Sequence, residues 1–126
     1  MGQQQLMLII AGVIVVGIAI AIGIYLFSGT SISSNRDAII NDLMNMGQYA
    51  YRYKMRPEPL AGGGLLYTGF VLPTKLAGNE NADYSATVAS MSITFTAVSR
   101  FGFGTIVGVL DTTGQLGHYT YTGDFQ

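Results

Sequence analysis

Residues 6–27 read LMLIIAGVIVVGIAIAIGIYLF, a run of 22 residues without a charged side chain. Fifteen of them are Leu, Ile, Val, Met or Phe. As an α-helix the run would rise about 33 Å, close to the roughly 30 Å hydrocarbon core of a bilayer. A strand of this length would far exceed the strands of globular proteins, and an open strand edge leaves backbone groups unsatisfied in lipid. The run therefore predicts a helix that is long enough to span a membrane.

The composition of the whole chain is that of an anchored or assembled structural protein. Its 126 residues are 49% hydrophobic and only 10% charged, and the first charged side chain is Arg36. Ordinary globular domains carry roughly 25% charged residues. The net charge of −1 argues against electrostatic capture of nucleic acid, because that needs clustered Lys and Arg. The lack of cysteine excludes disulfides, thiolate catalysis and Cys-based metal sites.

The apolar run lacks the features of a cleavable signal peptide. No basic residue precedes it, and it is longer than the usual apolar region of such peptides. No small-residue cleavage site is followed by a polar start of a mature chain. We therefore expect the helix to be retained in the working protein.

The small residues of the apolar helix fall on two opposite faces. Because a helix turns about 100° per residue, the two sets are Gly12, Ala19 and Gly23 on one face and Gly17, Ala21 and Ser28 on the other. Pairs of small residues four apart let helix backbones approach closely. Two opposite faces of this kind suit a helix with neighbours on several sides. Gly and Ala are also common in membrane helices that have no such neighbours.

Three neutral polar residues, Gln3, Gln4 and Gln5, precede the apolar run. They are either an interfacial cap of a membrane helix or a registration set. In the second interpretation they hydrogen-bond the amino terminus at Met1 or a neighbouring subunit inside an apolar bundle.

A second helical pattern, now amphipathic, follows the polar segment at residues 29–35. Two acidic residues near its start and three basic residues at its end complement the helix dipole, and Pro57 and Pro59 end it. If Gly29 produces only a kink, one helix runs from about residue 2 to 55. The apolar residues follow the i, i+3, i+4 rule, and the face predicted to pack against a sheet comprises Ile39, Ile40, Leu43, Tyr49 and Tyr53.

The remainder of the chain predicts a small β domain after a flexible glycine joint. Strands are expected at 65–72, 84–90, 91–98, 105–111 and 115–122, with a turn at 111–114 that closes a C-terminal hairpin. A core of about 70 residues supplies only a few kcal/mol of stability. We therefore expect this domain to rely on the helix, and on neighbouring subunits as well.

The predicted fold class is thus α+β, a long N-terminal helix followed by a small antiparallel sheet. The helix takes residues 1–56, of which 1–28 are apolar and 35–56 amphipathic, and the β domain takes 57–126.

The sequence contains no catalytic constellation. His118 is the only histidine, and it lies in a predicted strand beside Tyr119. The oxygen-rich loop at residues 78–83 lacks the EF-hand spacing and is typical of a plain polar turn. The glycine joint at 62–64 is not followed by the Lys of a P-loop. We expect no enzymatic activity, no cofactor and no bound metal.

The order of an uncharged apolar helix, an amphipathic helix and a small β domain resembles the type IV pilin superfamily. The stretches GQQQLMLIIAGVIVVGIAIAIGI, SNRDAIINDLMNMGQYAYRY, GGG and GFVLPTKL are similar to a group of small bacterial pilin-like proteins. Pilins usually carry a glutamate at the fifth mature position, which pairs with a neighbour's amino terminus. If Met1 is the mature start, that place holds Gln5, which offers a hydrogen bond but no charge.

The resemblance implies a structural subunit of an extracellular filament at the cell surface. Its partners would be further copies of itself, the inner membrane before assembly and the pilus assembly machinery. The alternative is a single-pass membrane protein that displays a small β interaction module.

Overall fold

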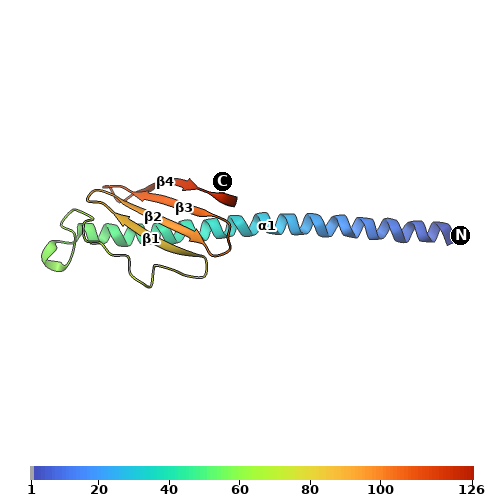
Figure 1. Ribbon diagram of the computed structural model, residues 1–126, viewed down its shortest axis with the longest axis horizontal. Helices are drawn as coiled ribbons and strands as arrows, with labels where there is room; N and C mark the ends of the chain where they lie inside the picture. The colour runs from blue at the N-terminus through green and yellow to red at the C-terminus, as the bar shows by residue number, and fades with distance from the viewer. Residues whose placement is uncertain (1) are drawn as a thin grey trace. The chain divides into compact units, whose positions relative to one another are not determined.

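The computed structural model describes residues 2–126 and has the α+β fold that the sequence predicts. One long helix precedes a four-stranded antiparallel sheet, and two short 3₁₀ helices lie outside it (Figure 1). The elements are α1 (Gly2–Met55), η1 (Glu58–Leu60), β1 (Ala82–Val88), β2 (Ile93–Ser99), β3 (Thr105–Leu110), β4 (Leu116–Tyr121) and η2 (Gly123–Phe125). The chain divides into a first unit that ends at Ser33 and a second unit, Ser34–Gln126.

Helix α1 continues through the polar segment at residues 29–35, so Gly29 does not end it. The hydroxyl of Thr30 donates a 3.0 Å hydrogen bond to the carbonyl of Leu26, one turn earlier. Ser and Thr hydroxyls satisfied in this way stay compatible with a helix. The helix ends at Met55, where Pro57 restricts the residue before it.

The sheet has the simple order β1-β2-β3-β4, with every neighbouring pair antiparallel. Phe95 on the central strand β2 lies opposite Ala86 on β1 and Gly108 on β3. A register shift between Val107 and Val109 bends the pairing of β3 with β4. The four strands correspond to the last four of the five predicted segments.

The strand predicted at residues 65–72 is wrong, because this segment folds as a series of turns. The backbone adopts positive φ at Leu65 (73°) and Gly69 (85°), a conformation outside the range of regular strands. Tyr67 and Phe70 are buried individually instead of alternating along an extended run. Because this turn segment contains several apolar residues, its sequence resembles that of a buried strand.

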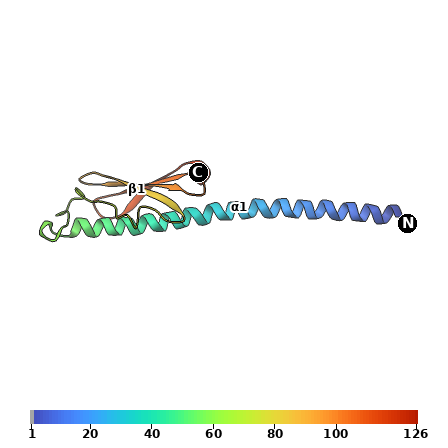
Figure 2. The ribbon, with the colours of Figure 1, turned by 60° about the horizontal axis from the view of Figure 1, so that its bottom comes forward.

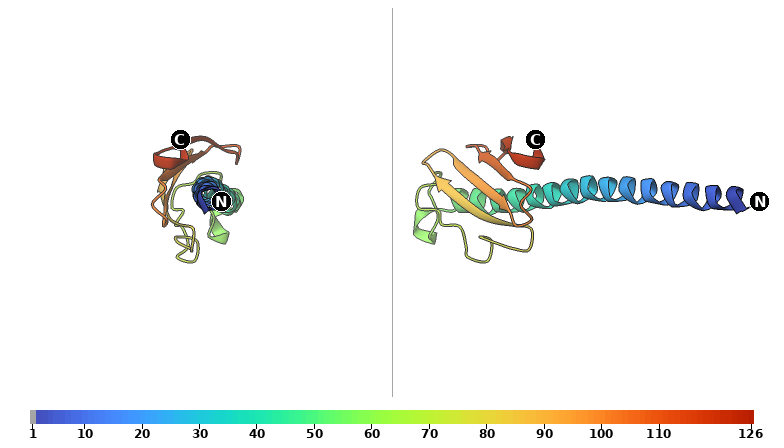
Figure 3. Two further views of the ribbon diagram at one scale, coloured as in Figure 1. Left: turned by 90° about the vertical axis from the view of Figure 1, so that its right-hand side faces the viewer. Right: turned by 45° about the vertical axis from the view of Figure 1, so that its right-hand side comes forward.

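The core of the second unit lies between one face of the sheet and the C-terminal stretch of α1 (Figure 2). The sheet curves around this stretch of the helix (Figure 3). A Cβ atom added to Gly47 would lie 3.4 Å from the Leu110 side chain, which shows how closely helix and sheet approach. The fully buried residues of α1 and of the strands are Ile39, Leu43, Ala50, Ala82, Ile93, Phe95, Ala97, Ile106 and Leu110.

Candidate functional site

The exposed apolar surface of α1 is the most prominent feature of the first unit. Between Leu6 and Phe27 the large apolar side chains are each more than half exposed. Within the described residues, α1 alone is long and apolar enough to cross a membrane, and no residue of its most apolar window is buried. Soluble monomers rarely expose contiguous apolar patches beyond a few hundred Å². This surface therefore needs lipid or protein to cover it.

Five of the six small residues predicted for helix packing lie on this exposed stretch of α1, and the sixth, Ser28, directly follows it. Cβ atoms added to Gly12, Gly17 or Gly23 would meet nothing within 4 Å in the described part of the chain. Ala19, Ala21 and Ser28 are exposed as well. A glycine inside a helix costs about 1 kcal/mol relative to alanine. No contact within residues 2–126 explains these glycines.

The predicted registration residues Gln3, Gln4 and Gln5 are exposed in the first turns of α1. Met1, the fourth member of that set, lies outside the described residues.

The residues predicted for helix–sheet packing separate into two groups. Ile39 and Leu43 are fully buried in the core, and Ile40 is half-buried. Tyr49, which is 47% exposed, and Tyr53 pack instead on Phe70 of the 65–72 turn segment, with ring centroids 6.1 and 5.5 Å apart. The Tyr53 hydroxyl also donates a 3.0 Å hydrogen bond to a carbonyl of that segment. The two tyrosines thus hold the segment that follows the helix.

A buried polar cluster that was not predicted from the sequence lies where α1 enters the second unit. Asn35 is 5% exposed, and its side-chain oxygen accepts a 2.8 Å hydrogen bond from the Ser99 hydroxyl at the end of β2. The Asn35 amide donates to the Asn81 carbonyl at 3.3 Å. Each buried polar atom in this cluster has a partner, so the cluster fixes the position of the helix along the sheet.

Asp42 provides a second polar connection, two turns further along α1. Its carboxylate accepts hydrogen bonds from the Tyr84 hydroxyl at 2.5 Å and from the Asn79 amide at 2.7 Å. Burial raises the pKa of Tyr84 well above its ordinary value, and the hydrogen bond to Asp42 and the Asp42 charge add to this increase. Tyr84 therefore remains a neutral hydrogen-bond donor.

Lys54 provides a third connection near the end of α1. It is 8% exposed, and its ammonium donates a hydrogen bond to the Thr112 carbonyl in the β3–β4 turn. The Lys54 nitrogen also lies 5.2 Å from the ring centre of Tyr67, whose hydroxyl donates to the Asp111 carbonyl at 2.6 Å. Burial, followed by the Asp111 charge, raises the pKa of Tyr67 to about 12.

One signal in the sequence could have revealed two of these connections. Asn35 and Lys54 fall on the same helical spacing as the buried apolar residues between them. A polar residue on a buried stripe needs a hydrogen-bond partner. The partners themselves, which lie 46 to 64 residues away along the chain, follow only from the three-dimensional structure.

The polar residues whose types could carry chemistry have structural roles or are dispersed. The side-chain oxygen of Asn79 in the 78–83 loop accepts hydrogen bonds from the backbone N–H groups of Asn81 and Ala82, at 2.8 and 3.1 Å. Asp83 forms an ion pair with Arg100 at 2.7 Å. Within residues 2–126 no group of three or more His, Cys, Asp or Glu side chains is placed to hold a metal ion. Comparisons with protein-family models, with curated proteins and with solved structures found no match to this chain.

Proposed function

We propose that this protein is a structural, non-enzymatic subunit of an extracellular filament like a type IV pilus, and that it polymerises through the apolar stretch of α1. The observation that carries the proposal is the exposure of residues 6–27 together with glycines that face open space. A surface this apolar cannot remain in water. A bilayer covers it before assembly, and the helices of neighbouring copies cover it in the filament.

The two opposite small-residue faces support an open polymer over a closed dimer. A two-fold dimer uses one self-complementary face, whereas contact between two different faces leaves a free face on every subunit. One set, represented by Ala19, would pack against the other set, represented by Ala21, on the next copy. Such contacts repeat without closing and generate a filament.

The partners of the chain in this proposal are further copies of itself, the cytoplasmic membrane before assembly and a pilus assembly machinery. The last of these follows only from the pilin resemblance. Registration between copies would use Gln3, Gln4 and Gln5 together with Met1. Because Gln5 carries no charge, this contact would depend on hydrogen bonding and would be only weakly affected by salt.

A second candidate function is a single-pass membrane protein that displays the second unit as an interaction module. The observation that favours it is the core of that unit, whose buried residues come from Ser34–Gln126 alone. In this case α1 would need no close packing with other copies. The protein would leave the membrane in detergent as a discrete species of low mass.

Cysteine cross-linking distinguishes these functions, because the chain contains no cysteine of its own. Ala19→Cys and Ala21→Cys place one thiol on each small-residue face. If the faces pack against each other, mild oxidation of the double variant in cells gives a ladder of cross-linked multimers. Each single variant gives little product, because its thiol faces a surface without one.

The matched control is the pair Ile20→Cys and Ile22→Cys, which has the same spacing but lies between the two faces. We expect no ladder from this pair. Dimers from either single variant on the small-residue faces would favour a two-fold dimer. No cross-linking from any variant would favour the isolated membrane anchor.

A further inference from the structure

A partly exposed aromatic cluster joins the β2–β3 turn to η2, and we call it the aromatic tip: Phe101, Phe103 and Phe125. Phe101 is 60% exposed and stacks on Phe103 with ring centres 5.8 Å apart. Phe103 meets the edge of Phe125 at 6.3 Å, and Phe125 is only 2% exposed. Phe125 thus anchors the tip in the core, and Phe101 exposes its aromatic ring on the surface.

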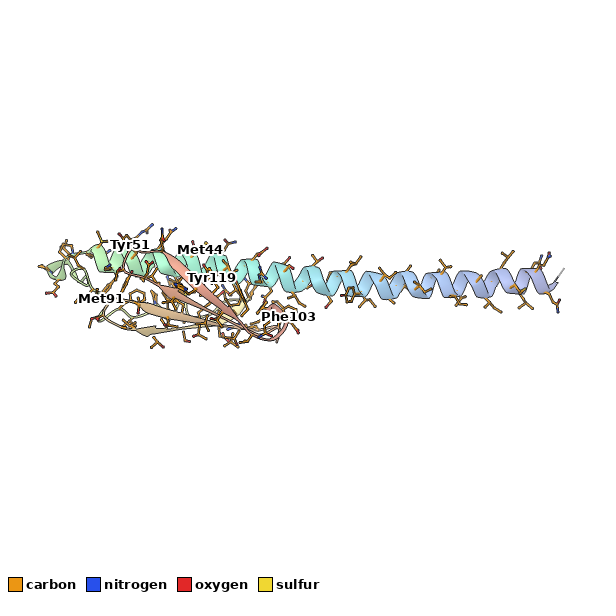
Figure 4. The ribbon with its side chains drawn as sticks, turned by 90° about the horizontal axis from the view of Figure 1, so that it is seen from above. Met44, Tyr51, Met91, Phe103 and Tyr119 are labelled. Carbon is orange, nitrogen blue, oxygen red and sulfur yellow. The ribbon has the colours of Figure 1, made fainter. Side chains whose placement is uncertain are left out.

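The aromatic tip lies at the end of the sheet where the chain enters the second unit. Ser99, two residues before Phe101, donates its hydroxyl to Asn35 at 2.8 Å, and the backbone N–H of Phe101 donates to the Ser99 oxygen at 3.2 Å. Asn35 is the second residue of the unit. Met91, in the β1–β2 turn, lies at the opposite end of the sheet from Phe103 (Figure 4).

Two arginines accompany the aromatic rings at this end. The guanidinium of the exposed Arg36 lies 5.1 Å from the ring centre of Tyr121. Arg100 is adjacent to Phe101 in sequence and remains 50% exposed in its ion pair with Asp83. Exposed aromatic rings beside arginines are suited to a membrane surface, where rings enter the acyl boundary and guanidinium groups meet lipid phosphates.

The covalent chain keeps the aromatic tip close to any membrane that holds the apolar run. Asn35 follows Phe27, the last residue of that run, by eight residues. Even a fully extended chain of eight residues spans at most about 28 Å. Tethering at such a distance raises the effective concentration of the surface and makes a weak contact sufficient.

We infer that the aromatic tip docks on the surface of the membrane in which residues 6–27 are embedded, with Phe101 in the interfacial region. Arg36 lies at a lipid phosphate in this arrangement. The inference rests on the membrane-inserted stage of the proposed function. It assigns to the tip the task of holding the second unit on the bilayer until the subunit is assembled.

Tryptophan fluorescence tests this inference, because the chain contains no tryptophan. The full chain with Phe101→Trp is reconstituted into vesicles of phosphatidylcholine and phosphatidylglycerol, with and without lipids that carry a quencher near the headgroup. We expect blue-shifted emission that loses most of its intensity with the quencher lipid. Met91→Trp, at a position that is 57% exposed at the other end of the sheet, keeps red-shifted emission and is not quenched.

A third variant, Ile14→Trp, reports separately whether the apolar run is inserted. If a quencher deep in the bilayer acts on Ile14→Trp while Phe101→Trp emits like Met91→Trp, the inference is overturned and the insertion stands. If Ile14→Trp is not quenched, insertion and inference fail together. Blue-shifted emission from Phe101→Trp that lipid does not quench, and that is lost on dilution with excess lipid, would assign the tip to a second copy and overturn the inference.

Discussion

At the scale of single residues, polar side chains rather than apolar ones determine where α1 lies along the sheet. Asn35, Asp42 and Lys54 bond to the sheet or its loops at successive positions along the helix. Apolar contacts tolerate small sliding movements, because they have no direction. Hydrogen bonds between buried groups resist such movements, because sliding would leave a buried group unpaired at a cost of about 1 to 3 kcal/mol.

Gly114 in the β3–β4 turn is another residue whose identity the structure requires. Its φ is 83°, and a Cβ atom there would lie 2.5 Å from the ring of Tyr51. We predict that Gly114→Ala destabilises the second unit by about 1 to 3 kcal/mol through backbone strain and this clash. Thermal unfolding of the full chain in detergent, followed by far-ultraviolet circular dichroism, measures the loss.

Two other glycines provide the controls for Gly114. Gly117 has no neighbouring atom within 4 Å and no left-handed φ, so Gly117→Ala should leave the midpoint unchanged. Gly102 has a φ of 78° but open space around it, so Gly102→Ala isolates the cost of the strain. Equal thermal unfolding midpoints for the Gly114 and Gly117 variants would contradict the predicted strain and clash at Gly114.

The raised pKa of Tyr67 predicts a loss of stability at high pH. The folded protein keeps Tyr67 neutral up to a pKa of about 12, whereas the unfolded chain ionises near the ordinary value of 10.0. The stability that neutral Tyr67 contributes to the folded state is therefore complete below pH 10.0 and is lost as the pH rises towards about 12. Thermal unfolding across this range measures it.

Tyr67→Phe removes this titration together with the hydrogen bond to the Asp111 carbonyl. We expect the variant to be less stable at neutral pH and to lose less stability above pH 10.0 than the parent chain. Tyr84→Phe is the comparison, since the pKa of Tyr84 is also raised. An unchanged pH profile in the Tyr67 variant would contradict the assignment.

Among the elements, the length of the apolar run and the periodicity that follows it predicted the two parts of α1, and four of the predicted strands match β1 to β4. The alternation of Ile93, Phe95 and Ala97 with polar residues marked β2, and the structure buries these three side chains completely. The strand prediction for residues 65–72 failed for a physical reason. Tyr67 and Phe70 are apolar because each fills its own place in the core, and local composition does not distinguish this from a buried strand.

The small-residue faces of α1 lead to a prediction for this element. Gly17→Leu and Gly23→Leu should leave insertion into the membrane intact, because leucine favours the apolar phase. Both should abolish filaments, because the larger side chain separates helix backbones that pack closely. Carbonate extraction of membranes measures insertion, and negative-stain electron microscopy detects filaments.

Gly29→Leu is the matched control for this prediction. Gly29 also has open space around it, but it lies off both small-residue faces. Filaments should persist in this variant. Normal filaments from both Gly17→Leu and Gly23→Leu would refute close packing of the helices.

At the scale of the whole molecule, the two units differ in what they bury. The second unit buries its large apolar side chains against one another, as an independent domain does. The first unit leaves its apolar side chains exposed over more than twenty residues. The sequence predicted this exposure, because the run has no polar side. Contacts that join distant residues, such as the aromatic tip and Asn35, could not be predicted from a single sequence.

Assembly of this chain into a filament is tested by electron microscopy of material sheared from the surface of cells that make it. Mass spectrometry of the same material identifies the subunit. Thin filaments composed of this chain are expected. A sheared fraction without filaments, with all of the protein remaining in the membrane, would contradict this expectation and favour the anchored module.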